Sequence, residues 1–196
     1  MNAVKGRRSI RKYQNRDVSD EMILEIIEAG RLALSAKNRQ PWKYVVFTGE
    51  SKKELLGEME KGIDREENVT AFLPDSRNGL ADAKYTLKVM YEAPAIIIVM
   101  NTNGKDPFVP LNTDGRITEI CDTLSIGASV ENMLLRAAEL NIGTLWIANT
   151  CFAYKELTEY LGEKGQLTGA IALGYPDETP NQRPRKMTEE IVEFRR

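Results

Sequence analysis

The sequence predicts a domain of the α/β or α+β class, with helices covering the faces of a sheet. Segments with the period of an amphipathic helix alternate along the chain with short segments that are β-branched, aromatic or aliphatic. With 196 residues, the chain has the usual length of one domain and can enclose a hydrophobic core. We therefore expect residues 1–196 to form a single domain.

Four segments are predicted to be strands because they are rich in β-branched, aromatic or aliphatic residues. The longest uninterrupted apolar run, Ala93–Met100, is far shorter than the roughly 20 residues that cross a bilayer, so it is interpreted as a buried strand. The predicted strands are Trp42–Thr48, Ala95–Met100, Thr144–Ala148 and residues 167–174.

Helical periodicity is clearest in the first and the longest of the predicted helices. Ser19 is a suitable N-cap for a helix over residues 20–34, and Asp20 and Glu21 complement the positive end of its dipole. A helix over residues 116–140 has one narrow polar stripe, so most of its surface is expected to be buried. The stripe consists of Glu119, Asp122, Ser129, Asn132, Arg136 and Glu139. Shorter helices are predicted over residues 51–61, 83–91 and 154–161.

The charge balance gives the chain no overall attraction to a polyanion. There are 27 Lys and Arg residues against 29 Asp and Glu residues, for a formal net charge of −2. Neither nucleic acid nor a membrane is therefore an expected partner. The charged start of the chain is not followed by an apolar run of signal-peptide length, so a cytoplasmic location is expected.

Histidine is absent from the sequence. This absence excludes a Ser-His-Asp triad, a Cys-His pair and a histidine pH switch. An enzyme of this composition would use a cofactor, or carboxylates, Lys, Tyr or Cys. Cys121 and Cys151 form no C-x-x-C pair, so we expect no redox pair or metal site, and predict two buried free thiols.

Basic clusters lie near both ends of the chain. Arg7, Arg8 and Arg11 flank Ser9, and guanidinium groups bind phosphate oxygens bidentately while a hydroxyl adds a neutral donor. On its own, this run is more typical of a solvated basic terminus. The second cluster, over residues 183–186, shifts the balance toward a phosphate site because it could close on the same anion.

A second constellation is the run from Ser35 to Trp42, which contains Asn38 and Gln40 and is closed by Pro41. Amide side chains carry both a donor and an acceptor, which suits a ring with alternating N–H, C=O and N positions, such as the pyrimidine edge of a flavin. The same residue types are ordinary in a turn between a helix and a strand. Taken alone, the run leaves both interpretations open.

Together, the two runs resemble the nitroreductase family of FMN-dependent oxidoreductases. Its members begin with an Arg-Arg-Ser-x-Arg-x-aromatic run, here Arg7 to Tyr13. One helix later they have a Ser-x-x-Asn-x-Gln-Pro-Trp run, here Ser35 to Trp42. Further segments resemble the family in the same order, so the resemblance covers nearly the whole chain. They are Glu92–Pro94, Ser125–Met133, Gly143–Ile147 and Gly174–Pro176.

The resemblance implies an α+β, nitroreductase-like fold with a central, mostly antiparallel sheet flanked by helices. It also implies an intertwined homodimer with FMN at the interface and with the long helix 116–140 buried between subunits. Residues 177–196 would be a C-terminal extension, whose segment Ile191–Phe194 crosses to the other subunit. Residues 60–82 are charged and weakly periodic, and we expect a mobile excursion there, near the active site.

The resemblance assigns the phosphate end of FMN to the basic clusters. Residues of the first cluster would bind the phosphate, the ribityl chain and the pyrimidine edge, and Arg11 would stabilise the negative charge of the reduced flavin. The residues concerned are Arg7, Arg8, Ser9 and Arg11, with Arg185 and Lys186 completing the phosphate site.

The resemblance assigns the ring end of FMN to two other segments. Ser35, Ala36 and Asn38, helped by Gln40, would reach the FMN that is held mainly by the partner subunit. Ala148 and Asn149, at the end of a strand, would lie against the isoalloxazine. Here the sequence departs from the Gly-Gly or Glu-Gly that is frequent in the family.

The implied activity is an NAD(P)H-dependent flavin oxidoreductase. NADH or NADPH would deliver a hydride to FMN and leave, and a small electron acceptor such as a nitroaromatic or a quinone would replace it, in a ping-pong sequence. No G-x-G-x-x-G run selects between the two nucleotides. A reductive dehalogenase, a flavin-fragmenting enzyme of the same superfamily and a non-catalytic flavin-binding protein are the alternatives.

Overall fold

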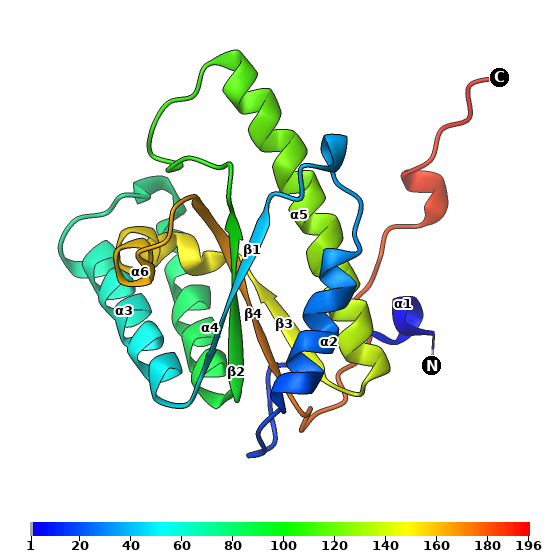
Figure 1. The fold of residues 1–196 in the computed structure, drawn as a ribbon, viewed down its shortest axis with the longest axis horizontal. Coiled ribbons are helices and arrows are strands. Elements are labelled where there is room, and N and C mark those ends of the chain that lie inside the picture. Colours follow the sequence, from blue (N-terminus) through cyan, green and yellow to red (C-terminus); the bar gives the residue numbers. More distant parts are fainter. Residues whose placement is uncertain (1) are drawn as a thin grey trace.

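A four-stranded sheet, covered by helices on both faces, forms the centre of the computed structural model, which describes residues 2–196 (Figure 1). The strand order is β1-β2-β4-β3, and every neighbouring pair is antiparallel. The strands are β1 (Trp42–Thr48), β2 (Ala95–Asn101), β3 (Gly143–Ile147) and β4 (Gln166–Gly174). The α+β class, the antiparallel sheet and all four predicted strands are thus confirmed, each strand end to within one residue.

The central strand β2 separates two hydrophobic clusters. Ile96 and Ile98 belong to the cluster on one face of the sheet, and Ile97 and Val99 to the cluster on the other. Every residue of β2 is buried, because helices cover both faces of the sheet. This explains why residues 95–100 form a continuous apolar run with no polar alternation.

Two helical layers enclose the sheet (Figure 1). One layer contains α2 (Asp20–Arg31) and α5 (Thr113–Glu139), and the other contains α3 (Gly49–Asn68), α4 (Leu80–Glu92) and α6 (Tyr154–Leu161). Ser19 caps α2 as predicted, since its Oγ accepts a hydrogen bond from the Met22 N–H at 3.4 Å. The predicted helices are all present, although α2 ends three residues early. None of the helices among residues 2–196 is long and apolar enough to cross a membrane.

The segment over residues 60–82 is more regular than the sequence indicated. The α3 helix extends to Asn68, seven residues beyond its predicted end, and a short 3₁₀ helix, η2 (Pro74–Gly79), leads directly into α4. The extension was missed because Glu66, which is only 1% exposed, is a charged residue on the buried face and interrupts the apolar pattern. For the rest of the segment over residues 60–82, the expected mobility stays a prediction.

The polar stripe of α5 is partly buried inside the domain. Asp122 and Ser129 are 1% and 0% exposed, because both have partners inside the domain. The exposed face of α5 instead carries apolar side chains: Ile117, Ile120 and Leu124 are 58%, 48% and 71% exposed. Within one chain, this helix is therefore less covered than its composition suggested.

Both cysteines are free, but the prediction that they are buried was wrong. Cys121 is half-buried and Cys151 is exposed. Cys151 lies in a short 3₁₀ helix, η3 (Asn149–Ala153), after the end of β3, where the chain leaves the sheet. The general tendency of free cysteines to be buried therefore did not predict the exposure of Cys151.

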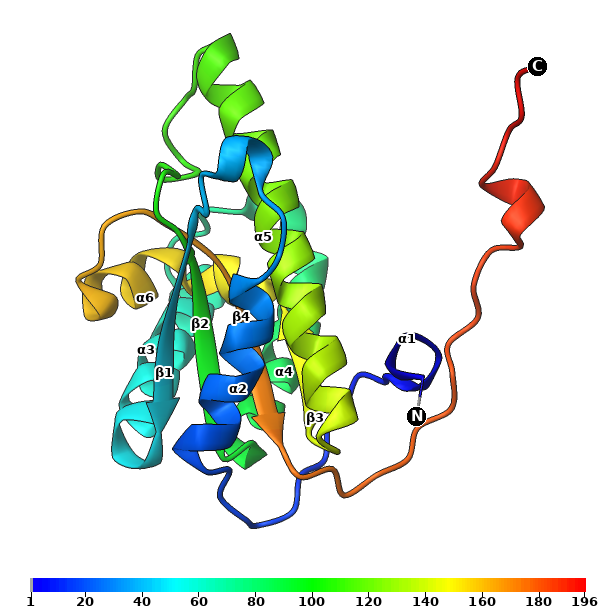
Figure 2. The same cartoon turned by 45° about the vertical axis from the view of Figure 1, so that its right-hand side comes forward.

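The two ends of the chain lie on the same side of the domain (Figure 2). The N-terminal segment includes a short helix, α1 (Ala3–Gly6), which was not predicted, and then joins the edge of the sheet through a parallel bridge between Ser9 and Thr144. Residues 181–196 are exposed and contain one short helix, η4 (Thr188–Glu190). The sheet edge at β3 therefore brings the two basic clusters near each other.

Candidate active site

Basic side chains from both ends of the chain line one cavity of about 180 Å³. The cavity lies between the N-terminal segment and the start of the C-terminal extension. Arg183 lines it together with Arg185, whereas Lys186 is exposed further along the extension and is not part of the wall. The predicted residues that line it are Arg7, Arg8, Ser9, Arg11 and Arg185.

Backbone hydrogen bonds hold the basic run in place from both sides. On the sheet side, the Ile10 N–H donates to the Thr144 carbonyl at 2.9 Å. On the side of the extension, the Arg11 N–H donates to Glu178 Oε1 at 2.5 Å, and the Asp177 N–H donates to the Lys12 carbonyl at 2.9 Å. The run therefore acts as a short strand between β3 and the extension, which fixes where its side chains begin.

The cavity retains uncompensated positive charge. Arg7 forms an ion pair with Glu131, with 3.3 Å between Nε and Oε1. Among residues 2–196, Arg8, Arg11 and Arg185 form no ion pair, and their guanidinium groups donate to backbone carbonyls. Guanidinium groups with free donors, next to the Ser9 hydroxyl, fit a phosphate group.

The turn that carries Asn38 and Gln40 has an unusual backbone. It contains a short 3₁₀ helix, η1 (Ala36–Asn38), and Lys37, Asn38 and Gln40 have φ values of 54°, 51° and 48°. Left-handed conformations in residues other than Gly are held by surrounding contacts, and they are frequent at ligand sites. Here the Gln40 N–H donates to Ser35 Oγ at 3.0 Å, and the Gln40 side-chain amide donates to Asn38 Oδ1 at 3.2 Å.

A half-buried ion pair that was not predicted from the sequence fastens this turn to α5. Arg39 donates through Nε and Nη2 to Oδ1 of Asp122, at 2.9 and 2.7 Å. These bonds raise the pKa of Arg39 above its ordinary value. Asn103 donates to the other oxygen of Asp122 at 3.3 Å, and the Ala36 N–H donates to Ser125 Oγ at 3.1 Å. The sequence contains one signal for this pair. Arg39 is a basic residue between the amide residues Asn38 and Gln40, and Asp122 is an acidic residue on a largely apolar helix.

One chain does not bring the turn and the basic cavity together. The Ala36 N–H reaches Ser125 of α5, whereas Arg7 pairs with Glu131. Six residues separate these two positions, which is about 9 Å along a helix. The turn and the basic cavity therefore contact α5 at different positions, and no residue of the turn lines the cavity.

The strand end at Ala148 and Asn149 is fixed by contacts with α4. The Asn149 side-chain amide donates to Asp82 Oδ2 and to Thr86 Oγ1, both at 3.1 Å. Its Oδ1 atom is buried and has no hydrogen-bond partner among residues 2–196. Ala148 is exposed, so it is the part of this turn that is open to a ligand.

The fold and the cavity together define an α+β domain with an arginine-lined site at the edge of an antiparallel sheet. The Nitroreductase family model matches residues 4–175. The chain therefore belongs to the nitroreductase family.

Known proteins similar to this chain include flavin enzymes. The chain is 25% identical over 187 residues to the NADPH-flavin oxidoreductase of Vibrio harveyi, a match that covers 94% of this chain and 69% of that protein. It is 26% identical over 205 residues to the iodotyrosine deiodinase of Hydra vulgaris, covering 98% and 71%. Among solved structures, the FMN-dependent nitroreductase NfnB from Mycobacterium smegmatis in complex with NADPH has a TM-score of 0.77 at 19% identity. That match covers 100% of this chain and 97% of NfnB, and it supports the fold.

Proposed function

We propose that this chain is an FMN-dependent oxidoreductase that uses NADH or NADPH to reduce nitroaromatics, quinones or similar small acceptors in a ping-pong sequence. The observation that carries the proposal is the basic cavity, in which arginines from both ends of a nitroreductase-family chain converge. FMN has a phosphate at one end and, when bound, supplies the ring that accepts and donates the hydride. Because both nucleotides are cytoplasmic, we propose that the enzyme acts in the cytoplasm.

The residues of this chain would bind and orient the cofactor. Arg7, Arg8, Ser9 and Arg185 offer the donors for its phosphate, and Arg183 adds a further guanidinium to the wall of the cavity. Ala148 would lie next to the ring. No side chain is required to exchange a proton or to form a covalent bond, which is compatible with a sequence without histidine.

We further propose a homodimer in which α5 lies at the interface. Its exposed apolar side chains, Ile117, Ile120 and Leu124, belong to the same end of α5 as Asp122, which anchors the turn with Asn38 and Gln40. Covering this face with a second subunit would bury apolar area and place each turn near the partner's cavity. In the C-terminal extension, Phe194 is 79% exposed and would also contact the partner.

A second candidate function differs from the first in its electron acceptor. The similarity to iodotyrosine deiodinase favours a second candidate, in which the reduced enzyme removes a halide from a halogenated phenol. Both candidate functions use the same cofactor site. They differ only in the compound that takes up the electrons after the nucleotide has left.

Anaerobic absorption spectroscopy tests the proposal. We expect the purified protein to be yellow with about one FMN per chain, to lose its flavin colour with NADH or NADPH, and to regain it with a nitroaromatic or a quinone. Recovery with a halogenated phenol and release of halide would instead support the second candidate. Bound FMN that neither nucleotide reduces would contradict the reductase and indicate a flavin-binding protein.

A further inference from the structure

A second cavity, of about 690 Å³, lies away from the basic cavity and shares no lining residue with it. Three aromatic side chains from different parts of the chain form its wall: Phe72 follows α3, Phe108 lies in the segment between β2 and α5, and Tyr154 begins α6. Neighbouring rings meet edge to face, with centroid distances of 5.9 Å for Phe72 and Phe108 and 5.8 Å for Phe108 and Tyr154. The volume and the aromatic lining are typical of a small-molecule site.

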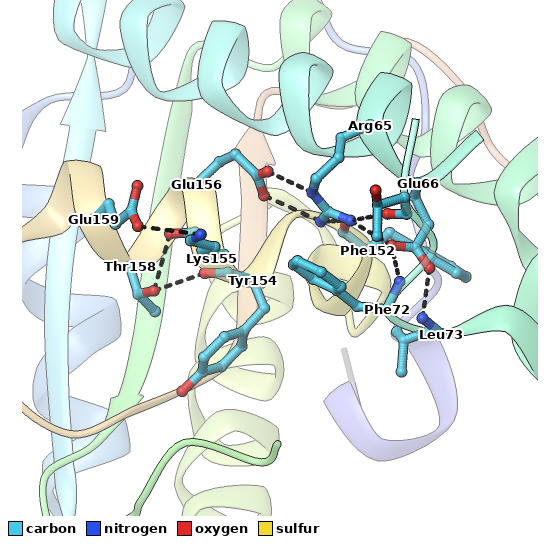
Figure 3. A network of polar contacts seen from close by, with 11 residues as sticks. Arg65, Glu66, Phe72, Leu73, Phe152, Tyr154, Lys155, Glu156, Thr158 and Glu159 are labelled. Carbon is cyan, nitrogen blue, oxygen red and sulfur yellow. Dashed lines mark hydrogen bonds and ion pairs between the residues drawn. The ribbon is translucent and has the colours of Figure 1, made fainter. Parts of the chain in front are cut away.

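A buried polar network fixes the wall around Phe72 (Figure 3). Glu66 accepts hydrogen bonds from the N–H groups of Phe72 and Leu73, at 2.9 and 2.5 Å. Arg65 binds Glu66 at 2.7 Å and Glu156 of α6 at 2.6 Å, and its guanidinium lies 4.0 Å from the centre of the Phe72 ring.

The network also ties this wall to α6 and η3. Besides its two carboxylate partners, Arg65 donates to the carbonyls of Thr70 and Phe152, at 2.9 and 3.1 Å. Because these hydrogen bonds join the end of α3, the residues after it and the η3–α6 segment, the wall exists before any ligand binds. A preformed wall lowers the entropy cost of binding a rigid ring.

The charge around the cavity favours a cation. Lys155 and Glu159 line the rim and lie opposite each other, 4.0 Å apart, so they largely cancel. Asp106 also lines the cavity, and it forms no ion pair among residues 2–196, while its Oδ1 accepts the Phe108 N–H at 2.8 Å. Burial raises the pKa of Tyr154, and the negative charge of Asp106 raises it further, so this carboxylate acts on the aromatic wall.

We propose that this cavity binds a small molecule that carries an aromatic ring and a protonated amine. The ring would pack against Phe72, Phe108 and Tyr154, where edge-to-face contacts with further rings are favourable. The amine would lie near Asp106, and the electron-rich faces of the rings add to its attraction. None of these residues belongs to the predicted flavin contacts, although Phe72 lies in the segment over residues 60–82 that is expected near the active site.

Isothermal titration calorimetry of the flavin-loaded protein tests the proposal with three compounds that share one ring. These are tryptamine, which is a cation, tryptophol, which is neutral, and indole-3-propionate, which is an anion. We expect tryptamine to bind once per chain, tryptophol to bind more weakly and indole-3-propionate to bind most weakly.

Two variants locate the site. Asp106→Asn is expected to weaken tryptamine binding about fivefold and to leave tryptophol unchanged, as for loss of one exposed ion pair. Phe108→Ala is expected to weaken all three about tenfold, because one aromatic contact is lost. Phe108 is 44% exposed, so this variant should keep its fold, which its melting temperature would verify. Asp17→Asn, which removes an exposed charge outside the cavity, is the control and should bind as the parent does.

Three results would overturn the proposal. They are no binding of tryptamine at millimolar concentration, tighter binding of indole-3-propionate than of tryptamine, and wild-type affinities in both cavity variants. The last result would place any observed binding elsewhere in the molecule.

Discussion

Arg39 and Asp122 determine the position of the turn that carries Asn38 and Gln40. Lys37 and Gln40 have left-handed backbone conformations, which cost of order 1–3 kcal/mol each when the residue is not Gly. The hydrogen bonds of Arg39 to a buried carboxylate offset this cost. The two residues would therefore contribute to flavin binding by fixing the turn, without touching the flavin themselves.

Asp122→Asn removes the charge of this pair and keeps the shape of the side chain. We expect the free energy of unfolding to fall by about 2 kcal/mol, as for hydrogen bonds to charged groups, and FMN affinity to fall about tenfold. The control, Glu28→Gln, breaks an exposed ion pair with Arg31 and should change stability by less than about 1 kcal/mol. Urea unfolding and flavin fluorescence titration measure both effects. Unchanged FMN affinity in a destabilised Asp122→Asn protein would show that the pair has only a structural role.

Glu66 is expected to make the stability of the fold depend on pH. The contacts of its carboxylate determine the direction of this dependence. Burial alone would raise the pKa of Glu66, but the N–H groups of Phe72 and Leu73 and the Arg65 guanidinium outweigh it and lower the pKa below the ordinary value. A carboxyl group with a lowered folded-state pKa stabilises the fold above its unfolded-state pKa, about 4.3. This stability is lost as pH falls through the folded-state pKa.

Glu66→Gln should therefore lose about 2 kcal/mol of stability at pH 7 and should show a smaller loss than the parent between about pH 5 and pH 3. The neighbouring exposed residue supplies the control, because Glu67→Gln removes only a surface ion pair with Lys84. Urea unfolding across this pH range measures the difference. Parallel pH profiles for the parent and Glu66→Gln would contradict the role assigned to the network.

The α3 helix shows how one element positions several others. Gly62 lies against η3, where an added Cβ would come within 2.4 Å of the Ala153 Cα atom. This close contact holds the turn that begins with Asn149 against the helix. Gly57 lies five residues earlier on the same helix, and an added Cβ there would meet nothing within 4 Å.

The two glycines predict opposite effects of the same substitution. Gly62→Ala should destabilise the protein by about 1–3 kcal/mol, because the backbone of η3 must move. Gly57→Ala should stabilise it by up to about 1 kcal/mol, since alanine is the better helix former and has room here. Thermal unfolding compares them directly, and equal shifts in Tm for both variants would refute the close packing of α3 on η3.

Elements with a local signal were predictable from the sequence, whereas buried charges were not. β2 is a continuous apolar run, and Ser19 followed by two acids marks the start of α2. By contrast, Glu66 and Asp122 are charged residues on buried faces, and each is satisfied by a partner distant in sequence or by backbone groups of another turn. Such residues break the apolar period, which is why the end of α3 was predicted seven residues too early.

The site could be predicted only as a set of residues. The two arginine clusters predicted residues of the basic cavity, because the arginines within each cluster are close together in the sequence. The choice of Arg183 over Lys186 depends on the path of the extension, and the anchoring of the Ser35 turn depends on contacts with α5. Neither follows from local sequence, since both are set by packing.

At the scale of the whole molecule, the proposed dimer depends on the exposed apolar face of α5. Leu124→Glu places a charge on the most exposed of the three apolar side chains of α5. We expect size-exclusion chromatography with light scattering to show a dimer for the parent and a monomer for this variant, which should also lose FMN. Val69→Glu, at an exposed apolar residue outside α5, should remain dimeric and retain FMN. A Leu124→Glu dimer that retains FMN would contradict the proposed interface.

We propose that the basic cavity binds the phosphate of FMN. The most direct test of this proposal is a fluorescence titration of the flavin-free protein with FMN and with riboflavin, which lacks the phosphate. We predict that the parent and Arg31→Ala, a variant outside the cavity, bind FMN at least about 100-fold more tightly than riboflavin. Arg185→Ala and Arg7→Ala should each reduce that ratio about tenfold without changing riboflavin affinity. Equal affinities for the two flavins in the parent, or an unchanged ratio in both cavity variants, would contradict a phosphate site in the basic cavity.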